Sequence, residues 1–186
     1  MNSKACLITL IIILLSFLSC YDNHRLIEEI QQLKNNPIDI DICKRGISFK
    51  NGVDTIYCYD EENPYRLIIY IDSLSCNQCF ITHMIESKEC ITELSSLGIE
   101  SIFIFEPKKE HIEEISSLLK DFAYPFWTIV MRNAEFSEVN PHIPSTPNLR
   151  SFLLNKENKV VVVGNPFRNI KIKALIKTSL KNEQER

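Results

Sequence analysis

Two cysteines separated by two residues directly follow an apolar run. The stretch RLIIYIDSLSCNQCF covers residues 66–80 and contains Cys76 and Cys79. Such a pair can exchange disulfides, contribute thiolates to a metal site, or simply be two small residues of a helix. The spacing does not choose between these chemistries, so the surrounding elements must decide.

The elements around the pair favour a reactive dithiol. The apolar run predicts a strand over 66–72, and apolar periodicity predicts a helix over about 76–97. Cys76 then lies in the first helical turn, with Ser75 as a candidate cap, and Cys79 lies one turn deeper. Unpaired backbone N–H groups and the helix dipole stabilise a thiolate there, so the pKa of the Cys76 thiol should fall below that of a free cysteine. We expect an exposed attacking Cys76 and a more shielded, resolving Cys79.

Strand and helix alternate after the pair. The predicted elements are a strand over 99–105, a helix over about 108–121, a strand over 126–131, two strands over 149–155 and 159–164, and a helix over 169–181. The β-α-β-α-β order predicts a sheet with parallel pairs and helices on its faces. The last two strands are separated only by the turn sequence KEN, which predicts an antiparallel pair.

An Asn51-Gly52 pair predicts a hairpin over 41–60, because type I′ turns prefer these two residues. If Lys50 pairs with Val53, one face carries the side chains of Cys43, Ile47, Phe49, Ile56 and Cys58. Cys43 and Cys58 become diagonal neighbours with Cα atoms about 7–8 Å apart, which is long for a disulfide. We expect two buried free thiols there, although the sequence leaves their pairing open.

The beginning of the chain is typical of an exported protein. A short cationic start, MNSK, precedes an apolar run of about 15 residues, which is shorter than a membrane span. The run ends in SFLSC, which resembles a bacterial lipobox with Phe17 where leucine is usual. The resemblance implies cleavage before Cys20 and a lipid on Cys20, whereas an ordinary secreted protein would be cut slightly downstream. Either route leads to an oxidising compartment where disulfides persist.

Length and charge limit the remaining possibilities. We predict a signal peptide over 1–19, a lipid-anchored helix or spacer over 20–39, and one domain over 40–186. A single domain is expected because the mature chain is too short to form two sizeable hydrophobic cores. The 186 residues include 21 basic and 24 acidic side chains, for a net charge of −3. These charges are interspersed, so nothing indicates a nucleic-acid partner.

Residues 40–182 resemble the thioredoxin-like superfamily, specifically the membrane-anchored TlpA/ResA-like thiol–disulfide oxidoreductases of bacteria. The resemblance rests on a hairpin before the CNQC strand, the following βαβ unit, and the proline loop and terminal hairpin in STPNLRSFLLNKENKVVVVGNP. It implies an α/β fold of three layers, α/β/α, with a central mixed sheet. The chain departs from the family at Ser75, where an aromatic residue is usual, and at Gln78, where proline is frequent.

The same resemblance implies a peptide-binding loop. It makes Pro147 a cis proline opposite the dithiol and gives Thr146 the task of offering its backbone to a bound peptide, with Pro141 and Pro144 as competing assignments. The implied activity is disulfide exchange with protein thiols in the cell envelope. No dissociable cofactor is needed, because the electrons travel as thiols, but an unidentified redox partner is required. Asn77 and Gln78 leave open whether the protein reduces, oxidises or isomerises.

Two alternatives remain. The protein could be a redox-inert module of the same fold that binds a partner. It could also handle copper in a manner similar to the Sco family, with Cu(I) held by the two thiolates and by His142 or His83. A zinc site is not indicated, because the sequence contains no second Cys-x-x-Cys and no His-x-x-x-His to complete four ligands. Asp72 and Glu106 each end a predicted strand and could accept the proton of the resolving thiol, or be solvated strand ends.

Overall fold

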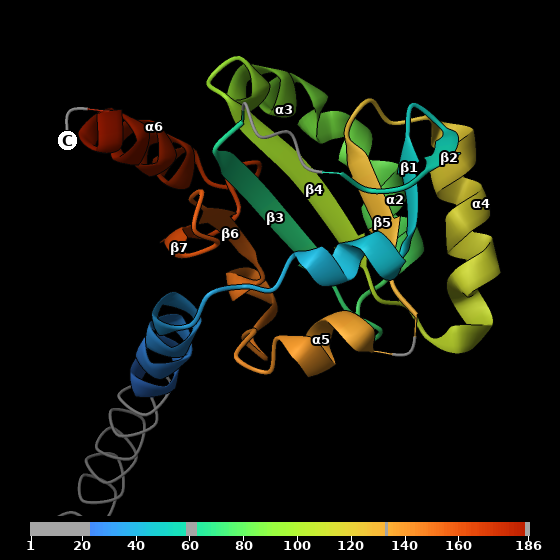
Figure 1. Cartoon of the computed structure of the whole chain (residues 1–186), viewed down its shortest axis with the longest axis horizontal. Coiled ribbons are helices and arrows are strands. Elements are labelled where there is room, and N and C mark those ends of the chain that lie inside the picture. The colour runs from blue at the N-terminus through green and yellow to red at the C-terminus, as the bar shows by residue number, and fades with distance from the viewer. Residues whose placement is uncertain (1–22, 59–62, 133, 185–186) are drawn as a thin grey trace, which may run out of the picture.

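A computed structural model describes residues 23–58, 63–132 and 134–184. Within these residues, seven strands form one mixed sheet in the order β2-β1-β5-β4-β3-β6-β7 (Figure 1). The strands are β1 (Ile47–Lys50), β2 (Val53–Thr55), β3 (Tyr65–Ile71), β4 (Ile99–Phe105), β5 (Trp127–Val130), β6 (Ser151–Leu154) and β7 (Val160–Val163).

The described helices connect or cover these strands. The α-helices are α2 (Asn77–Met84), α3 (Lys88–Ser95), α4 (Ile112–Phe122), α5 (Glu135–Val139) and α6 (Ile170–Gln184), and residues 23–35 are also helical. The short 3₁₀ turns are η1 (Asp41–Arg45), η2 (Ile85–Ser87), η3 (Lys109–His111) and η4 (Pro147–Leu149).

Strand directions follow from the connections. β3 pairs in parallel with β4, and β4 in parallel with β5, because a helical crossover separates each pair along the chain. β6 runs antiparallel to β3, and β7 antiparallel to β6 across a short turn. The predicted parallel centre and antiparallel terminal pair are confirmed.

Side chains alternate between two apolar layers on either face of the sheet. Leu67 and Ile69 of β3 join the cluster that is covered by α2, α3, α4 and α6. Ile68 joins the opposite cluster, which includes Leu33 of the N-terminal helix, residues of η1 and Phe136 of α5. In Figure 1, η1 crosses in front of the sheet while α2 and α3 lie behind it. The predicted three-layer α/β/α class is therefore confirmed.

The single helix predicted over 76–97 is wrong, since the chain forms α2 and α3 with the 3₁₀ turn η2 between them. A straight helix of that length would extend about 33 Å, whereas a seven-residue strand such as β3 spans about 23 Å. The interruption lets Met84 in α2 and Ile91 in α3 both pack in the same layer against the sheet.

The predicted hairpin is confirmed in its turn and register, with Lys50 opposite Val53. Its shared apolar face is wrong. Cys43 lies in η1 and is buried in the opposite layer from Phe49, while Cys58 is exposed. The reason is that β2 is an edge strand that ends at Thr55, and of the residues after it Tyr57 turns inward and packs on Trp127, which leaves Ile56 and Cys58 exposed. Cys43 and Cys58 are both free thiols.

Candidate active site

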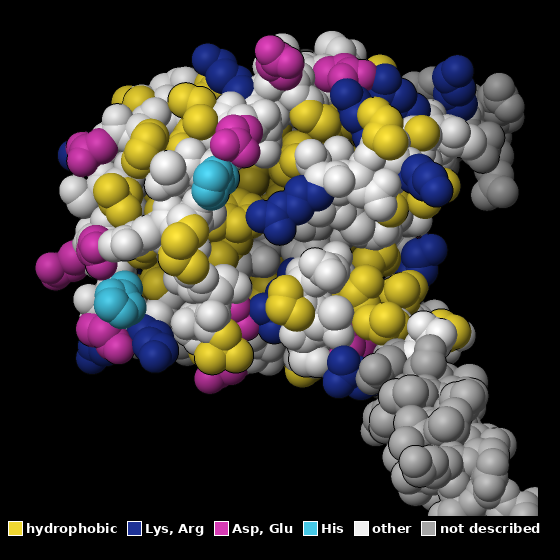
Figure 2. Space-filling view, turned by 180° about the vertical axis from the view of Figure 1, so that it is seen from behind, with side chains coloured by type: hydrophobic (Ala, Val, Ile, Leu, Met, Phe, Trp, Pro, Cys, Tyr) yellow, Lys and Arg dark blue, Asp and Glu magenta, His cyan; other side chains and the backbone are white. Residues whose placement is uncertain are grey.

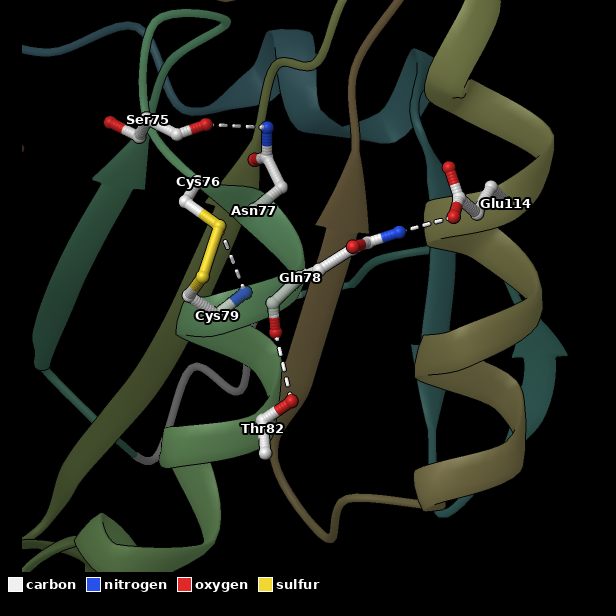
Figure 3. The surroundings of a disulfide bond; sticks show 7 residues. All are labelled: Ser75, Cys76, Asn77, Gln78, Cys79, Thr82 and Glu114. Carbon is white, nitrogen blue, oxygen red and sulfur yellow. Dashed lines mark hydrogen bonds between the residues drawn. A yellow bond between two sulfur atoms is a disulfide. The ribbon is translucent and has the colours of Figure 1, made fainter.

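Cys76 and Cys79 form a disulfide at the amino end of α2, with their Cα atoms 5.4 Å apart (Figure 3). Cys76 itself is the N-cap, because its Sγ accepts the Cys79 N–H at 3.4 Å and its carbonyl oxygen accepts the Phe80 N–H at 3.0 Å. The predicted position at a helix amino end is confirmed to within one residue, but Ser75 is not the cap. The Cys79 N–H, which as a first-turn donor has no carbonyl partner within the helix, thus points toward the Cys76 sulfur.

Both residues of the pair are exposed, so the expected shielding of Cys79 is wrong. The helical period explains the difference. α2 buries Ile81 and Met84 against the sheet, and Cys79 stands two residues, or about 200° of helical rotation, away from Ile81. An incoming thiol can therefore reach either sulfur from solvent.

The turn between β3 and the disulfide is held by a buried carboxylate. Asp72, at 9% exposed, accepts the Ser75 N–H at 3.1 Å and the Ser75 hydroxyl at 2.7 Å. Its other oxygen pairs with the Arg150 guanidinium at 2.6 Å. The carboxylate thus fixes the residue that immediately precedes Cys76.

Arg150 links this turn to the proline loop. Its Nε donates to the Pro144 carbonyl at 2.9 Å and its Nη2 to the Ser145 carbonyl at 2.7 Å, while only 9% of the residue is exposed. Sequence reasoning missed Arg150. The available signal was a charged residue at the start of a strand that the apolar pattern places inside the sheet, where a buried cation needs partners.

Pro147 lies beside the disulfide because β6 runs antiparallel to β3. The loop that begins β6 therefore meets the end of β3 that leads to Cys76. A pocket of about 740 Å³ is lined by both cysteines and by Pro147. Pro141 and Pro144 instead line a neighbouring cavity of about 640 Å³. Of the three candidate prolines, only Pro147 shares the pocket of the disulfide in the described part of the chain.

The Thr146–Pro147 peptide bond is trans, since the described residues contain no cis peptide; the cis bond implied by the family resemblance is wrong here. The Thr146 N–H donates to Glu29 Oε2 at 3.1 Å, and the Ser145 hydroxyl donates to Glu29 Oε1 at 2.9 Å. Burial opposes ionisation of Glu29, but these hydrogen bonds outweigh it and hold the pKa of its carboxyl below the ordinary value. The backbone donor expected to meet a peptide is thus occupied by the N-terminal helix.

Comparisons with known proteins identify relatives at the level of structure alone. No family model matches the chain, and no curated protein matches it. A structure from Chlorobium tepidum assigned as the thiol:disulfide interchange protein DsbE has a TM-score of 0.50 at 12% identity, covering 73% of this chain and 92% of that one. The pneumococcal exposed lipoprotein thioredoxin from Streptococcus pneumoniae also has a TM-score of 0.50, at 16% identity, covering 74% and 98%.

The fold is thioredoxin-like. The described sheet with its covering helices matches these structures over nearly their whole length, and the dithiol lies at the amino end of the helix after the first parallel strand. The identities are too low to carry over any activity, so function has to be argued from the site itself.

The two residues between the cysteines contact different neighbours. Gln78 donates its amide to the Glu114 carboxylate of α4, and Asn77 donates to the Ser75 carbonyl at 3.3 Å (Figure 3). The first contact anchors α2 to α4. The second holds the motif against the preceding turn.

The carboxylates at the strand ends are buried, so the reading as solvated strand ends is wrong. Glu106, at 4% exposed, accepts the Tyr70 hydroxyl at 2.6 Å and the Phe136 N–H at 2.8 Å. Burial, reinforced by the hydrogen bond to Glu106, raises the pKa of Tyr70. Glu106 and Asp72 line the 640 Å³ cavity and not the pocket of the disulfide, so their position gives no support to a role in accepting the Cys79 proton.

Three further sequence features concern metal and membrane. His83 lines the disulfide pocket and lies 3.1 Å from Glu86, whereas His142 does not line it. Among the described residues, no three His, Cys, Asp or Glu side chains gather closely enough to hold a metal ion. The same residues include no helix that is both long and apolar enough to span a bilayer. Cys20 lies outside the described residues.

Proposed function

We propose that this protein is an enzyme that exchanges disulfides with protein thiols through Cys76 and Cys79. The observation that carries the proposal is the exposed disulfide at the amino end of α2, in one pocket with Pro147. A disulfide that served only as a staple would gain nothing from exposure at a helix end whose N–H groups favour the thiolate. The thioredoxin-like fold supports the same reading.

The exchange follows two displacements at sulfur. In the reduced protein, the Cys76 thiolate attacks one sulfur of a partner disulfide, which forms a mixed disulfide and releases the partner's other sulfur as a thiolate. The Cys79 thiolate then attacks the Cys76 sulfur, which closes the intramolecular disulfide and releases the second partner thiolate. Two electrons pass to the partner and the protein is oxidised. The same steps reversed oxidise a partner dithiol.

The proline loop would shape the partner's approach. Pro147 lines the pocket, and Thr146 would offer its backbone to an extended peptide. For that, the Thr146 N–H must exchange Glu29 for a peptide carbonyl. The partner peptide would then lie across the face of α2 that exposes both sulfurs.

We place the exchange in a bacterial cell envelope, with a lipid on Cys20, residues 20–39 as the anchored segment and 40–186 as the catalytic domain. The signal-like start and the lipobox-like SFLSC support this location. One of the similar structures is itself an exposed lipoprotein thioredoxin. Mass spectrometry of the membrane fraction tests the anchor, since an unmodified amino terminus away from Cys20 would refute it.

The exchange is tested by trapping. In Cys79→Ser the resolving thiol is absent, so a mixed disulfide between Cys76 and a reducible protein should accumulate and disappear with dithiothreitol. Cys76→Ser is the matched control and should trap little, because its remaining thiol lies outside the N-cap. Absence of a trapped adduct in Cys79→Ser, together with no disulfide reduction by the reduced wild type, would favour the redox-inert module.

A further inference from the structure

The pocket beside the disulfide extends from α2 across to the start of α6. Apolar side chains of Phe80, Leu149, Val163 and Ile172 line it, and polar side chains of Asn165 and Asn169 stand on the α6 side. On the face shown in Figure 2, an apolar floor lies in a hollow that is bordered by a histidine and by a basic side chain. At about 740 Å³ it is large enough for a few residues of a partner chain.

The charged side chains that line this pocket are all basic. No Asp or Glu lines it among the described residues, while His83, Arg150 and Arg168 do. Arg150 is neutralised by Asp72, and His83 faces Glu86 of the following turn η2. Arg168 is exposed, and its guanidinium forms no ion pair with any side chain in residues 23–58, 63–132 or 134–184.

Two cations of α6, in contrast to Arg168, are paired with an acid. Lys173 and Lys177 both form ion pairs with Glu93 of α3, which bridges the two helices. Arg168 precedes α6 and forms no ion pair with a described acid, although Glu86 lines a smaller neighbouring pocket together with Arg168. Of the three basic side chains that line the disulfide pocket, Arg168 is therefore the one without an ion pair in the described part of the chain.

Building on the proposed exchange activity, we propose that Arg168 selects partner segments that carry an acidic side chain close to the reacting cysteine. The planar guanidinium can bind a carboxylate through two parallel hydrogen bonds, while an apolar neighbour of that acid fills the floor by Phe80 and Ile172. A basic residue in the same place would meet Arg168 with no carboxylate of the pocket to offset the repulsion. Arg168 is thus a specificity-determining residue, and the occupant is an acidic polypeptide segment.

The test compares two peptides that differ only in charge. Each contains one internal disulfide flanked by leucine, with glutamate beside the cysteine in one and lysine in the other. The reduced full-length chain, in mild detergent, should reduce the glutamate peptide about five-fold faster at low salt, because exposed charges act mainly on association. The preference should shrink in 0.5 M salt, where the Debye length falls to a few ångströms.

Variants assign the preference to one residue. Arg168→Gln should abolish it, and Arg168→Glu should reverse it. Lys171→Gln removes an exposed charge near the start of α6 outside the pocket and should leave it unchanged. Equal rates for both peptides in the wild type, or a preference that survives in Arg168→Gln, would overturn the inference while leaving the exchange activity intact. Failure to reduce either peptide, with no adduct trapped by Cys79→Ser, would overturn both.

Discussion

Replacing Arg150 by methionine should destabilise the domain strongly, because the guanidinium neutralises a buried carboxylate. The Arg150 and Asp72 side chains are 11% and 13% exposed and lie 2.6 Å apart. Without Arg150, the Asp72 carboxylate keeps its hydrogen bonds from Ser75 but loses the only cation with which it pairs among the described residues, and two loop carbonyls lose their donors.

The magnitude follows from these contacts. Removing one partner of a buried ion pair costs about 3–5 kcal/mol, and the partial exposure of both side chains places this case near 3 kcal/mol. For a domain of this size, about 2–4 °C of melting temperature is lost per kcal/mol. We therefore expect Arg150→Met to melt about 6–12 °C lower than the wild type, with the disulfide kept oxidised in both.

A double-mutant cycle in urea checks the reasoning. Asp72→Asn combined with Arg150→Met removes both charges, so the double variant should be less destabilised than the sum of the single variants, by about 2 kcal/mol. Lys159→Met is the matched control, since it breaks the exposed pair with Glu157 and should change the free energy of unfolding by less than about 0.5 kcal/mol. A coupling energy between Asp72 and Arg150 below about 0.5 kcal/mol would refute the role assigned to this pair.

Three further predictions use other parts of the structure. Iodoacetamide at pH 8 should label exposed Cys58 within minutes and leave Cys43 unlabelled until the protein unfolds. The reason is that Cys43 is 0% exposed and burial raises the pKa of its thiol. Equal labelling of the two cysteines, measured by mass spectrometry, would contradict this prediction. Burial lowers the pKa of His142, so the unfolded chain binds its proton more readily. That contribution to stability is complete above pH 6.5 and is lost as the pH falls through the folded pKa, so His142→Gln should flatten the decline in urea stability between pH 7 and 5, and an unchanged slope would count against it. Gly52→Ala and Gly98→Ala both place a Cβ at positive φ, but only at Gly52 does that atom fall 2.6 Å from a backbone carbonyl of α4. Thermal melting should therefore show that Gly52→Ala loses at least about 1 kcal/mol more stability than Gly98→Ala. Equal losses of stability would argue against the close approach.

The contact between Glu29 and the proline loop links the N-terminal helix to the proposed function. Leu33 of this helix is fully buried in the layer opposite α2, so the helix is held against the domain while Glu29 reaches Thr146. A peptide that binds to Thr146 would have to compete with that carboxylate. The N-terminal helix therefore contacts the loop that we propose to bind the partner peptide.

Much of this architecture could be predicted because it follows from short-range patterns. Apolar alternation and helical periodicity located β4 exactly over 99–105 and placed Cys76 at a helix amino end to within one residue. The β-α-β-α-β order then required parallel neighbours, because a helical crossover returns the chain in the same direction. The Asn51-Gly52 turn fixed the hairpin register for the same local reason.

Tertiary structure alone decided what surrounds the dithiol. The ion pair that joins Asp72 to Arg150 and the hydrogen bond from Thr146 to Glu29 connect residues far apart in the chain, the latter separated by 117 positions. The exposure of Cys79 likewise depends on which face of α2 the sheet covers. Because a helix has 3.6 residues per turn, Cys79, two residues before the buried Ile81, lies on the opposite side of the helix. Local patterns define the elements and their order, whereas charge neutralisation and burial are set by packing between elements, which those patterns do not specify.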